Sequence, residues 1–238
     1  SRLLGDLNEL SRNQHLEQYG AKLFESLFQG QVGVALAVAT TLAGERSEGK
    51  LRIRLALDSS LPAEAWAIRW ELLCQRSGRD ELPLAIDPLT PISRYATLAK
   101  EEPEPLNEMQ IRLLFVVSAP SDVKLHADPI DVEQELTKLH AALQDVWRSG
   151  RCVVTIMPGQ SGVSDALRAA LEQSKCQIVA GPATLENISR NLDGQHVLHF
   201  LGHGKLEVNQ GALLLEKEDS TAIWTTDEDL AGKLKNRE

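Results

Sequence analysis

The sequence has little cysteine and no long uninterrupted apolar segment. Its three cysteines, Cys74, Cys152 and Cys176, are scattered and form no C-x-x-C pair, which excludes a disulfide framework and favours a reducing, cytoplasmic setting. No run of 18 apolar residues is present, and the first residues lack the basic and then apolar order of a signal peptide. We therefore expect a soluble protein that has no membrane as its partner.

Positive charge is scarce relative to negative charge. The formal net charge is −9 at pH 7, with 25 Lys and Arg residues against 34 Asp and Glu residues. Because no segment concentrates Lys and Arg into a basic face, nucleic acid is not expected as a partner. The net negative field favours, weakly, the approach of a basic polypeptide over an acidic one.

A charged stretch that contains proline divides the chain. Lys100–Asn107, with the sequence KEEPEPLN, combines charge with two prolines and is typical of a connector. With 238 residues and a hydrophobic content of 42%, the chain is large enough for a small domain on each side of it. We therefore predict an N-terminal α+β subdomain over residues 1–105 and an α/β subdomain over residues 106–238.

The N-terminal part predicts a helix followed by a strand. The helix is indicated by apolar residues at helical spacing, which are Leu16, Tyr19, Leu23, Leu27 and Phe28. The alternation of apolar and polar residues in Leu51–Leu57 predicts a half-exposed strand. Trp66–Cys74 is compatible with either a second strand or a buried helical turn.

After the connector, continuous apolar strands alternate with amphipathic helices, a pattern typical of a mostly parallel sheet flanked by helices. The expected strands are Arg112–Ser118, Cys152–Met157 and Val197–Leu201, with a brief apolar segment at Cys176–Ala180. Three helices are expected. The first starts at Asp128–Pro129, has an apolar face from Val132 to Val146 and stops at Gly150. The second spans Val163–Gln173, and the third runs from a Thr184 cap to Leu192. The second half of the chain is therefore predicted to be an α/β domain.

The segment His196–Gly204, HVLHFLGHG, carries the candidate chemistry. In an open parallel sheet, functional residues gather just past the carboxyl ends of the strands, and His203 follows an expected strand at such a place. A histidine is suited to general acid or base catalysis near neutral pH. Gly204 has no side chain, so its backbone N–H is accessible to a developing oxyanion.

Two other interpretations of this segment compete with catalysis. As metal ligands, His199 and His203 would lie about 13 Å apart in a strand, and no third ligand is evident, so no metal is expected. His203 can also be a loop residue without a chemical role beside a buried His199. For His199, at the end of an apolar strand, a structural role is the better explanation.

Several widely spaced segments resemble the CHAT family, whose caspase-like domains are often joined to helical repeats. The similar segments are Leu61–Pro62 with Trp70–Leu73, Thr90–Tyr95, Leu113–Asp122, Ile130–Glu135, Thr184–Leu192 and Val197–Gly204. The resemblance runs from about Leu51 to the end of the chain. It implies a caspase-like fold for residues 106–238, a protein substrate, and helical-repeat (TPR-type) regions or a regulatory protein as partners, without a cofactor.

The resemblance also implies roles for individual residues. In the CHAT family the second histidine of the HxxGHG pattern is the general base, which here is His203. The glycine after it contributes to the oxyanion hole, which here is Gly204. The resemblance further implies a hairpin of Gly204–Val208 and Ala212–Glu216 around a turn at Asn209–Gly211, and a helix over Asp227–Leu234.

The catalytic cysteine is not apparent. In caspase-type sites it follows the histidine by about 50 residues, and the sequence reaches Glu238 before that distance from His203. Cys74, Cys152 and Cys176 all precede His203 and adjoin apolar segments, where a small buried hydrophobe is expected. The resemblance therefore implies a cysteine endopeptidase domain that lacks its C-terminal part, and we expect these residues to be inactive alone.

Two other functions fit the same pattern. A pseudo-peptidase would use the fold only to bind a partner or to transmit a regulatory signal, and would need no cysteine. A nucleotide-binding or flavodoxin-like module would fit the alternating strands and helices. Its phosphate loop would be Met157–Val163, but this segment lacks the GK[ST] ending and is better explained as a strand-to-helix turn.

Overall fold

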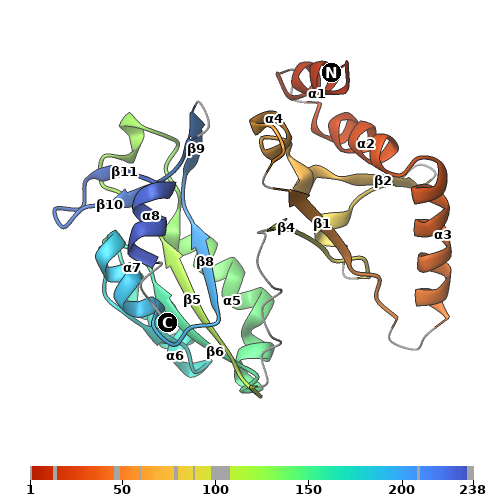
Figure 1. Ribbon diagram of the computed structural model, residues 1–238. Coiled ribbons are helices and arrows are strands. Elements are labelled where there is room, and N and C mark those ends of the chain that lie inside the picture. Colours follow the sequence, from red (N-terminus) through yellow and green to blue (C-terminus); the bar gives the residue numbers. More distant parts are fainter. Residues whose placement is uncertain are drawn as a thin grey trace. The chain divides into compact units, whose positions relative to one another are not determined.

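The computed structural model describes residues 2–12, 15–45, 49–58, 60–77, 80–87, 89–97, 108–207 and 210–234. The chain forms two compact units, Ser1–Pro103 and Glu104–Glu238, both of which are drawn in Figure 1.

The first unit combines helices with two small sheets. Its strand pairs are β1 (Ile53–Asp58) with β4 (Ile92–Thr97), which run parallel, and β2 (Cys74–Ser77) with β3 (Asp80–Pro83), which run antiparallel. Its helices are α1 (Arg2–Arg12), α2 (Leu16–Leu27), α3 (Gly30–Gly44) and the short α4 (Ala63–Trp66), with the 3-10 turns η1 (Trp70–Leu72) and η2 (Leu84–Ile86).

The predictions for this unit are confirmed except at the ends of the elements. Helix α2 ends at Leu27, so Phe28 lies beyond it, and β1 begins at Ile53. For Trp66–Cys74 the helical alternative is the right one, since η1 precedes β2 and the first strand residue is Cys74.

Helix α2 packs against η1 at one close approach. A Cβ on Gly20 would collide with the carbonyl oxygen of Leu72 and would meet Cys74 Cβ at 2.9 Å. The Tyr19 hydroxyl accepts a hydrogen bond from the Arg69 amide at 3.0 Å. Together with the fully buried Leu73, these contacts fix the helix on the core of the first unit, and they require glycine at position 20.

Helix α3 differs from its neighbours because it buries none of its residues. It has no charged side chain, and four of its large apolar residues, Val32, Val34, Val38 and Leu42, are exposed. Among the described residues, no single helix is long and apolar enough to cross a bilayer. Only α2 and α3 taken together meet that length and composition, and they are bent by 102° at the break between them.

The second unit is built on a parallel sheet. Four strands, β5 (Ile111–Val117), β6 (Cys152–Met157), β7 (Gln177–Ile178) and β8 (Val197–Leu201), lie in the order β7-β6-β5-β8. The helices are α5 (Val132–Arg148), α6 (Asp165–Gln173), α7 (Leu185–Leu192) and α8 (Asp227–Leu234), with a 3-10 turn η3 at Val123–Leu125. The predicted α/β class with a parallel sheet flanked by helices is confirmed.

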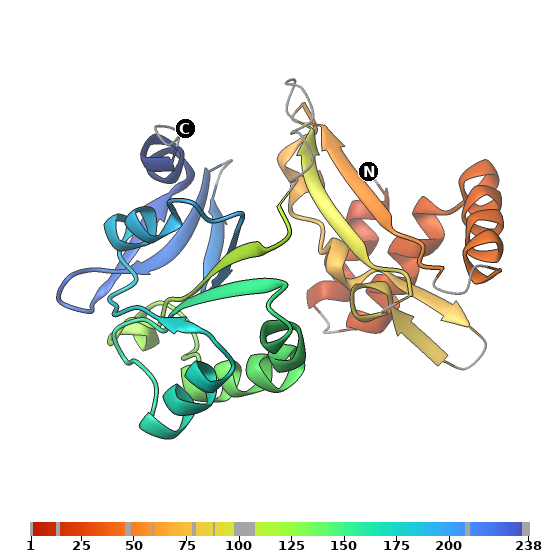
Figure 2. The same ribbon diagram turned by 90° about the horizontal axis from the view of Figure 1, so that it is seen from below.

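The two faces of this sheet have separate cores. Helices α5 and α6 cover one face, where Phe115, Leu136 and Ile156 belong to one buried cluster. On the other face, Val116 and Met157 pack with Ile188 of α7. In Figure 2 the green and teal helices lie on one side of the sheet and the blue helices on the other. Strands β5 and β6 are therefore buried on both faces, which explains their continuous apolar sequence.

The predicted helix starts are correct where a capping residue was recognised. Thr184 accepts a hydrogen bond from the Asn187 amide at 3.0 Å and begins α7 as predicted. Helix α5 begins at Val132 rather than at Asp128–Pro129, because Asp131 is its cap and accepts from the Gln134 amide. Val146 is 48% exposed and does not share the buried face of α5.

Two loops in this unit were predicted with the right type of structure. Gly150, with φ +74°, follows α5 as the predicted stop. Met157–Val163 connects β6 to α6, as predicted for a strand-to-helix turn, although α6 itself starts at Asp165 behind its cap Ser164.

A small antiparallel sheet completes the unit, with the order β11-β10-β9. Its strands are β9 (Gly204–Glu207), β10 (Gln210–Glu216) and β11 (Ala222–Thr226). The predicted hairpin is confirmed, but its turn is not at Asn209–Gly211, because Gln210 already pairs with Glu207. Val208 and Asn209 lie outside the described residues. Helix α8 spans Asp227–Leu234 as predicted.

Candidate active site

His203 lies at the carboxyl edge of the parallel sheet, between β8 and β9. The Ser118 amide donates a hydrogen bond to the carbonyl oxygen of Leu201 at 3.0 Å, so β5 and β8 end side by side. Gly202 forms the bend that follows, and a Cβ at this position would collide with the ring of Phe200. The chain therefore turns directly after β8 and presents His203 where open α/β sheets place functional residues.

The imidazole of His203 has a nitrogen without a partner. Its Nε2 atom is buried and makes no hydrogen bond to any of the described residues. Buried polar atoms in proteins are nearly always paired. An unpaired ring nitrogen at the carboxyl edge of a parallel sheet is suited to exchanging a proton with a group that the chain itself does not supply.

The orientation of the Gly204 N–H follows from the hairpin register. The Leu214 amide donates a hydrogen bond to the carbonyl oxygen of His203 at 2.8 Å, and Gly204 is paired with Leu213 in the register of the two strands. Hydrogen-bonded and non-hydrogen-bonded pairs alternate along an antiparallel ladder. The Gly204–Leu213 pair is therefore of the non-hydrogen-bonded kind, and the Gly204 N–H points away from β10, one residue after His203.

The other two histidines of the motif have different environments. His199 is exposed and stacks on Phe115, with ring centroids 4.6 Å apart. The expectation of a buried His199 is therefore wrong, because β8 is an edge strand. His196 lies at the opposite edge, where its Nδ1 accepts a hydrogen bond from the Arg112 amide at 3.1 Å and its Nε2 is 3.4 Å from a Glu108 carboxylate oxygen. These contacts give His196 a structural role.

The cysteines of the second unit are remote from His203 within the sheet. Cys152 is the first residue of β6 and Cys176 directly precedes β7, so both lie at the amino edge. Because β6 has six residues, its two edges are about 20 Å apart. Burial raises the pKa of both thiols, that of Cys176 to about 11, which opposes formation of a reactive thiolate.

The third cysteine is buried within its own unit. Cys74 is only 3% exposed and lies in the first unit, against Gly20 of α2. A buried thiol among apolar groups behaves as a small hydrophobe. Cys74 and Cys176 are therefore buried and Cys152 is partly buried, which agrees with their predicted role as small hydrophobes.

Strand β10 joins His203 to the segment that follows β5. Besides its bond to the His203 carbonyl, Leu214 accepts a hydrogen bond at its own carbonyl from the Ser118 hydroxyl, at 2.8 Å. Ser118 is completely buried. Leu214 thus connects His203 to the end of β5 through two main-chain groups, and neither Ser118 nor Leu214 was recognised from the sequence as part of the site.

A second buried anchor is Glu216, the last residue of β10, which is 1% exposed. Its Oε1 accepts a hydrogen bond from the Ala119 amide at 3.0 Å. Its Oε2 accepts from the Gln160 amide at 2.9 Å and from the Ala183 amide at 2.7 Å. One carboxylate therefore binds the loops that follow β5 and β6 and the loop that precedes α7.

The starts of α5 and α6 are occupied by acidic side chains. Glu133 accepts hydrogen bonds from both the amide and the hydroxyl of Ser164, the cap of α6, and Asp131 caps α5. Helix N-termini that bind phosphate leave their amides free for the ligand. Here Asp131 takes the Gln134 amide and Glu133 takes the Ser164 amide. Both carboxylates also repel an anion, which argues against the nucleotide-binding alternative.

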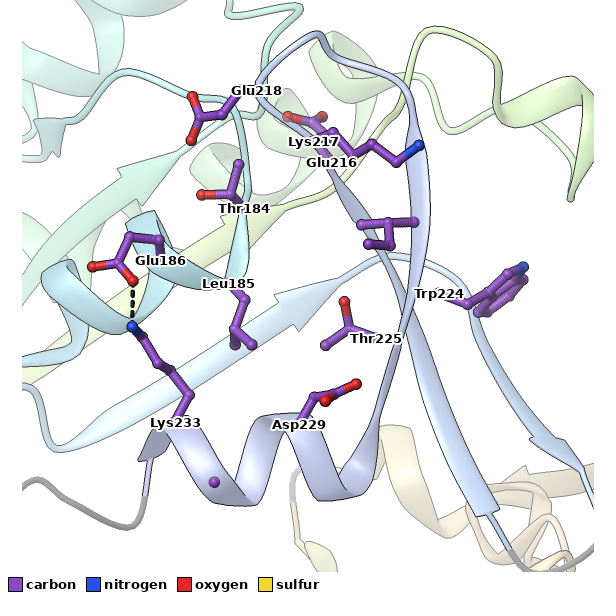
Figure 3. Close-up of a pocket in the computed structure, with 12 residues that line it drawn as sticks. Thr184, Leu185, Glu186, Glu216, Lys217, Glu218, Trp224, Thr225, Asp229 and Lys233 are labelled. Carbon is purple, nitrogen blue, oxygen red and sulfur yellow. Dashed lines mark ion pairs between the residues drawn. The ribbon is translucent and has the colours of Figure 1, made fainter.

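The second unit also has a hollow of about 590 Å³ between α7, α8 and the β10–β11 hairpin. Figure 3 shows Leu185 and Thr225 facing the space, with an ion pair between Glu186 and Lys233 at one side. The lining residues include Glu216 but neither His203 nor Gly204. Its lining combines apolar side chains such as Leu185 and Ile223 with charged ones such as Asp229.

The described residues contain no group of three or more His, Cys, Asp or Glu side chains placed to hold a metal ion. Comparison with models of protein families, with curated proteins and with solved structures finds no match for this chain.

Proposed function

We propose that the unit Glu104–Glu238 is the histidine-bearing part of a caspase-like cysteine endopeptidase domain of the CHAT type. The observation that carries the proposal is the pairing of a buried, unpartnered His203 Nε2 with an adjacent Gly204 N–H that points away from its hairpin. A general base and an oxyanion donor on consecutive residues are what acyl transfer to a thiol requires.

In this mechanism the nucleophile is a cysteine from outside these 238 residues, because Cys152 and Cys176 lie at the amino edge of the sheet, opposite His203, and Cys74 is buried inside the first unit. His203 Nε2 takes the thiol proton, and the thiolate attacks the peptide carbonyl carbon. The carbonyl oxygen becomes an oxyanion that the Gly204 N–H stabilises. The C–N bond then breaks, and the amine leaves with the proton from His203. Water next gives a proton to His203 and attacks the thioester, whose C–S bond breaks, and His203 returns the proton to the thiolate.

The open edge of β8 indicates where the missing thiol would enter. Val197 and Leu198 lie on opposite faces of β8 and are 41% and 38% exposed, whereas β5, its neighbour, is buried at Leu114 through Val117. An apolar edge strand with unpaired backbone groups is a template for a further strand. A strand on this edge would end beside His203, which is the place that the caspase-like resemblance gives to the catalytic cysteine.

The test uses the longest product of the gene that contains this sequence. We expect it to cleave unfolded protein and to be labelled by peptide probes with a thiol-reactive group. His203→Gln should abolish both, while His199→Gln, in the preceding strand β8, should leave both in place. The 238-residue chain alone should be inactive.

Three results would each contradict the proposal. One is cleavage that survives His203→Gln, since a general base cannot then be His203. Another is activity of the 238-residue chain that disappears in Cys152→Ala or Cys176→Ala, because the nucleophile would then be internal. The last is a longer product without a cysteine that can reach His203, which would make the protein a catalytically inactive interaction module.

A further inference from the structure

We infer that Glu216 is a positioning residue for His203, acting through β10 and the loops at the carboxyl edge of the sheet. The inference rests on the proposed role of His203 as a base and adds to it a buried carboxylate that touches neither substrate nor thiol. Its basis is the chain of contacts that begins at Glu216 and ends at the His203 carbonyl.

The first step is the convergence of three backbone amides on one side chain. The donors are Ala119, Gln160 and Ala183, which are 97, 56 and 33 residues away from Glu216 in the sequence. The Glu216 amide also donates to the Ala183 carbonyl at 3.2 Å. A carboxylate only accepts hydrogen bonds, so it alone among the side chains of this size satisfies all three N–H groups.

The second step is the tightness of the surrounding loops. Gly159 has φ +74°, and a Cβ there would meet Glu216 Oε1 at 2.6 Å. A Cβ on Gly181 would in turn collide with the main chain of Gly159. Glycine at both positions lets the two loops approach the Glu216 carboxylate closely. The positions of the loops therefore depend on the position of this carboxylate.

The third step links this cluster to His203. Ala119, one of the donors to Glu216, follows Ser118, whose hydroxyl binds the Leu214 carbonyl while the Leu214 amide binds the His203 carbonyl. Glu216 and Leu214 belong to the same strand. A shift of the loop at Ala119 therefore displaces the Ser118 hydroxyl, which binds the Leu214 carbonyl. Because the Leu214 amide binds the His203 carbonyl, the shift is passed on to the main chain of His203.

The experiment compares Glu216→Gln with Glu218→Gln in the 238-residue chain. Both remove one negative charge, but Glu218 is exposed in the turn after β10. NMR would follow amide hydrogen exchange at Ala119, Gln160 and Ala183, together with the pH titration of the His203 ring. In Glu216→Gln an amide NH₂ faces at least one backbone N–H, so we expect exchange at least tenfold faster and a shifted midpoint for His203. Glu218→Gln should change neither.

The inference is overturned if the three amides lose protection in Glu216→Gln while the His203 titration matches that of the unsubstituted chain. Glu216 would then stabilise the loops without positioning the base. If Glu216→Gln does not fold, Glu216→Asp retains the charge and withdraws the carboxylate by one methylene. The same shift in the His203 midpoint is expected, and an unchanged midpoint again refutes the inference.

These readouts need no thiol and no peptidase activity, so they are independent of the proposed function. If the longer gene product proves active, Glu216→Gln should lower its kcat more than it raises its KM, because the base is misplaced while substrate contacts persist. A shifted His203 without any peptidase would refute the proposed function and leave the positioning role intact.

Discussion

The amide of Leu214 donates a hydrogen bond to the carbonyl oxygen of His203 at 2.8 Å. This bond closes the hairpin directly after the parallel sheet, and the alternation of the ladder turns the next amide, that of Gly204, away from β10. The main chain thus presents a donor beside the imidazole without any side chain to support it. The orientation of this donor can be tested by removing the N–H alone.

Gly204→Pro should remove the oxyanion donor and leave the fold intact. The N–H of Gly204 is not used by the hairpin, and proline is tolerated at the first residue of an edge strand. Loss of one such donor lowers kcat by about 10²- to 10³-fold. Peptidase assays of the longer gene product check this, and a variant with full activity would show that Gly204 is not the donor.

Gly204→Ala is the matched control for that substitution. It keeps the N–H, and its Cβ would meet Leu213 Cδ2 at 3.5 Å and the Ala212 carbonyl at 3.6 Å, which are ordinary contacts. We expect activity and thermal stability close to those of the unsubstituted protein. A loss in Gly204→Ala equal to that in Gly204→Pro would indicate a steric effect rather than a missing hydrogen bond.

Cys176 should resist alkylation in the folded chain. With its pKa raised to about 11 from 9.0 by burial, its thiolate at pH 8 is roughly a hundredfold scarcer than in an unfolded chain. Because the folded thiol keeps its proton while the unfolded thiol loses it, the contribution of this site to stability is present below pH 9 and is lost as the pH rises toward 11. Iodoacetamide labelling with and without urea measures the first effect. Equal rates would show an accessible thiol.

Elements with a strong period and a recognisable cap could be predicted from the sequence. Strands β6 and β8 and helix α7 begin and end where the pattern placed them, and α8 has the bounds that the family resemblance implied. Helix α3 was not predicted, because an uncharged apolar segment without polar faces has no helical period. The start of α5 was misplaced, since proline at a first position and Asp131 as a cap are competing signals only a few residues apart.

The candidate site could be predicted only where its residues belong to a local motif. His203 and Gly204 belong to one short motif that follows a predicted strand, so local sequence locates them. The role of Glu216 depends on amides from Ala119, Gln160 and Ala183. From the sequence alone, a glutamate at the end of an apolar strand is expected to be exposed. Only the folded backbone brings those partners together.

Gly20→Ala should destabilise the first unit. The added Cβ collides with the Leu72 carbonyl and crowds Cys74, and overpacking of this kind costs about 1–3 kcal/mol. Gly5→Ala is the comparison, because a Cβ at Gly5 of α1 has no atom within 4 Å and alanine is favoured in a helix by about 1 kcal/mol. Hydrogen exchange of the α2 amides reports the free energy of unfolding, and a tolerated Gly20→Ala would contradict the packing of α2 on η1.

The open edge of β8 should make the 238-residue chain associate with itself. Exposed apolar edge strands pair with other chains, and a lysine on the edge suppresses this. Leu198→Lys should therefore lower the apparent mass at high protein concentration in sedimentation equilibrium.

The control is Val146→Lys on α5. It replaces an apolar residue that is 48% exposed, more than the 38% of Leu198. It should have no effect, because α5 has no unpaired strand backbone. If both lysines act equally, association depends on general apolar exposure. If Leu198→Lys alone acts, the edge of β8 is open to a further strand, as the proposed position of the thiol requires.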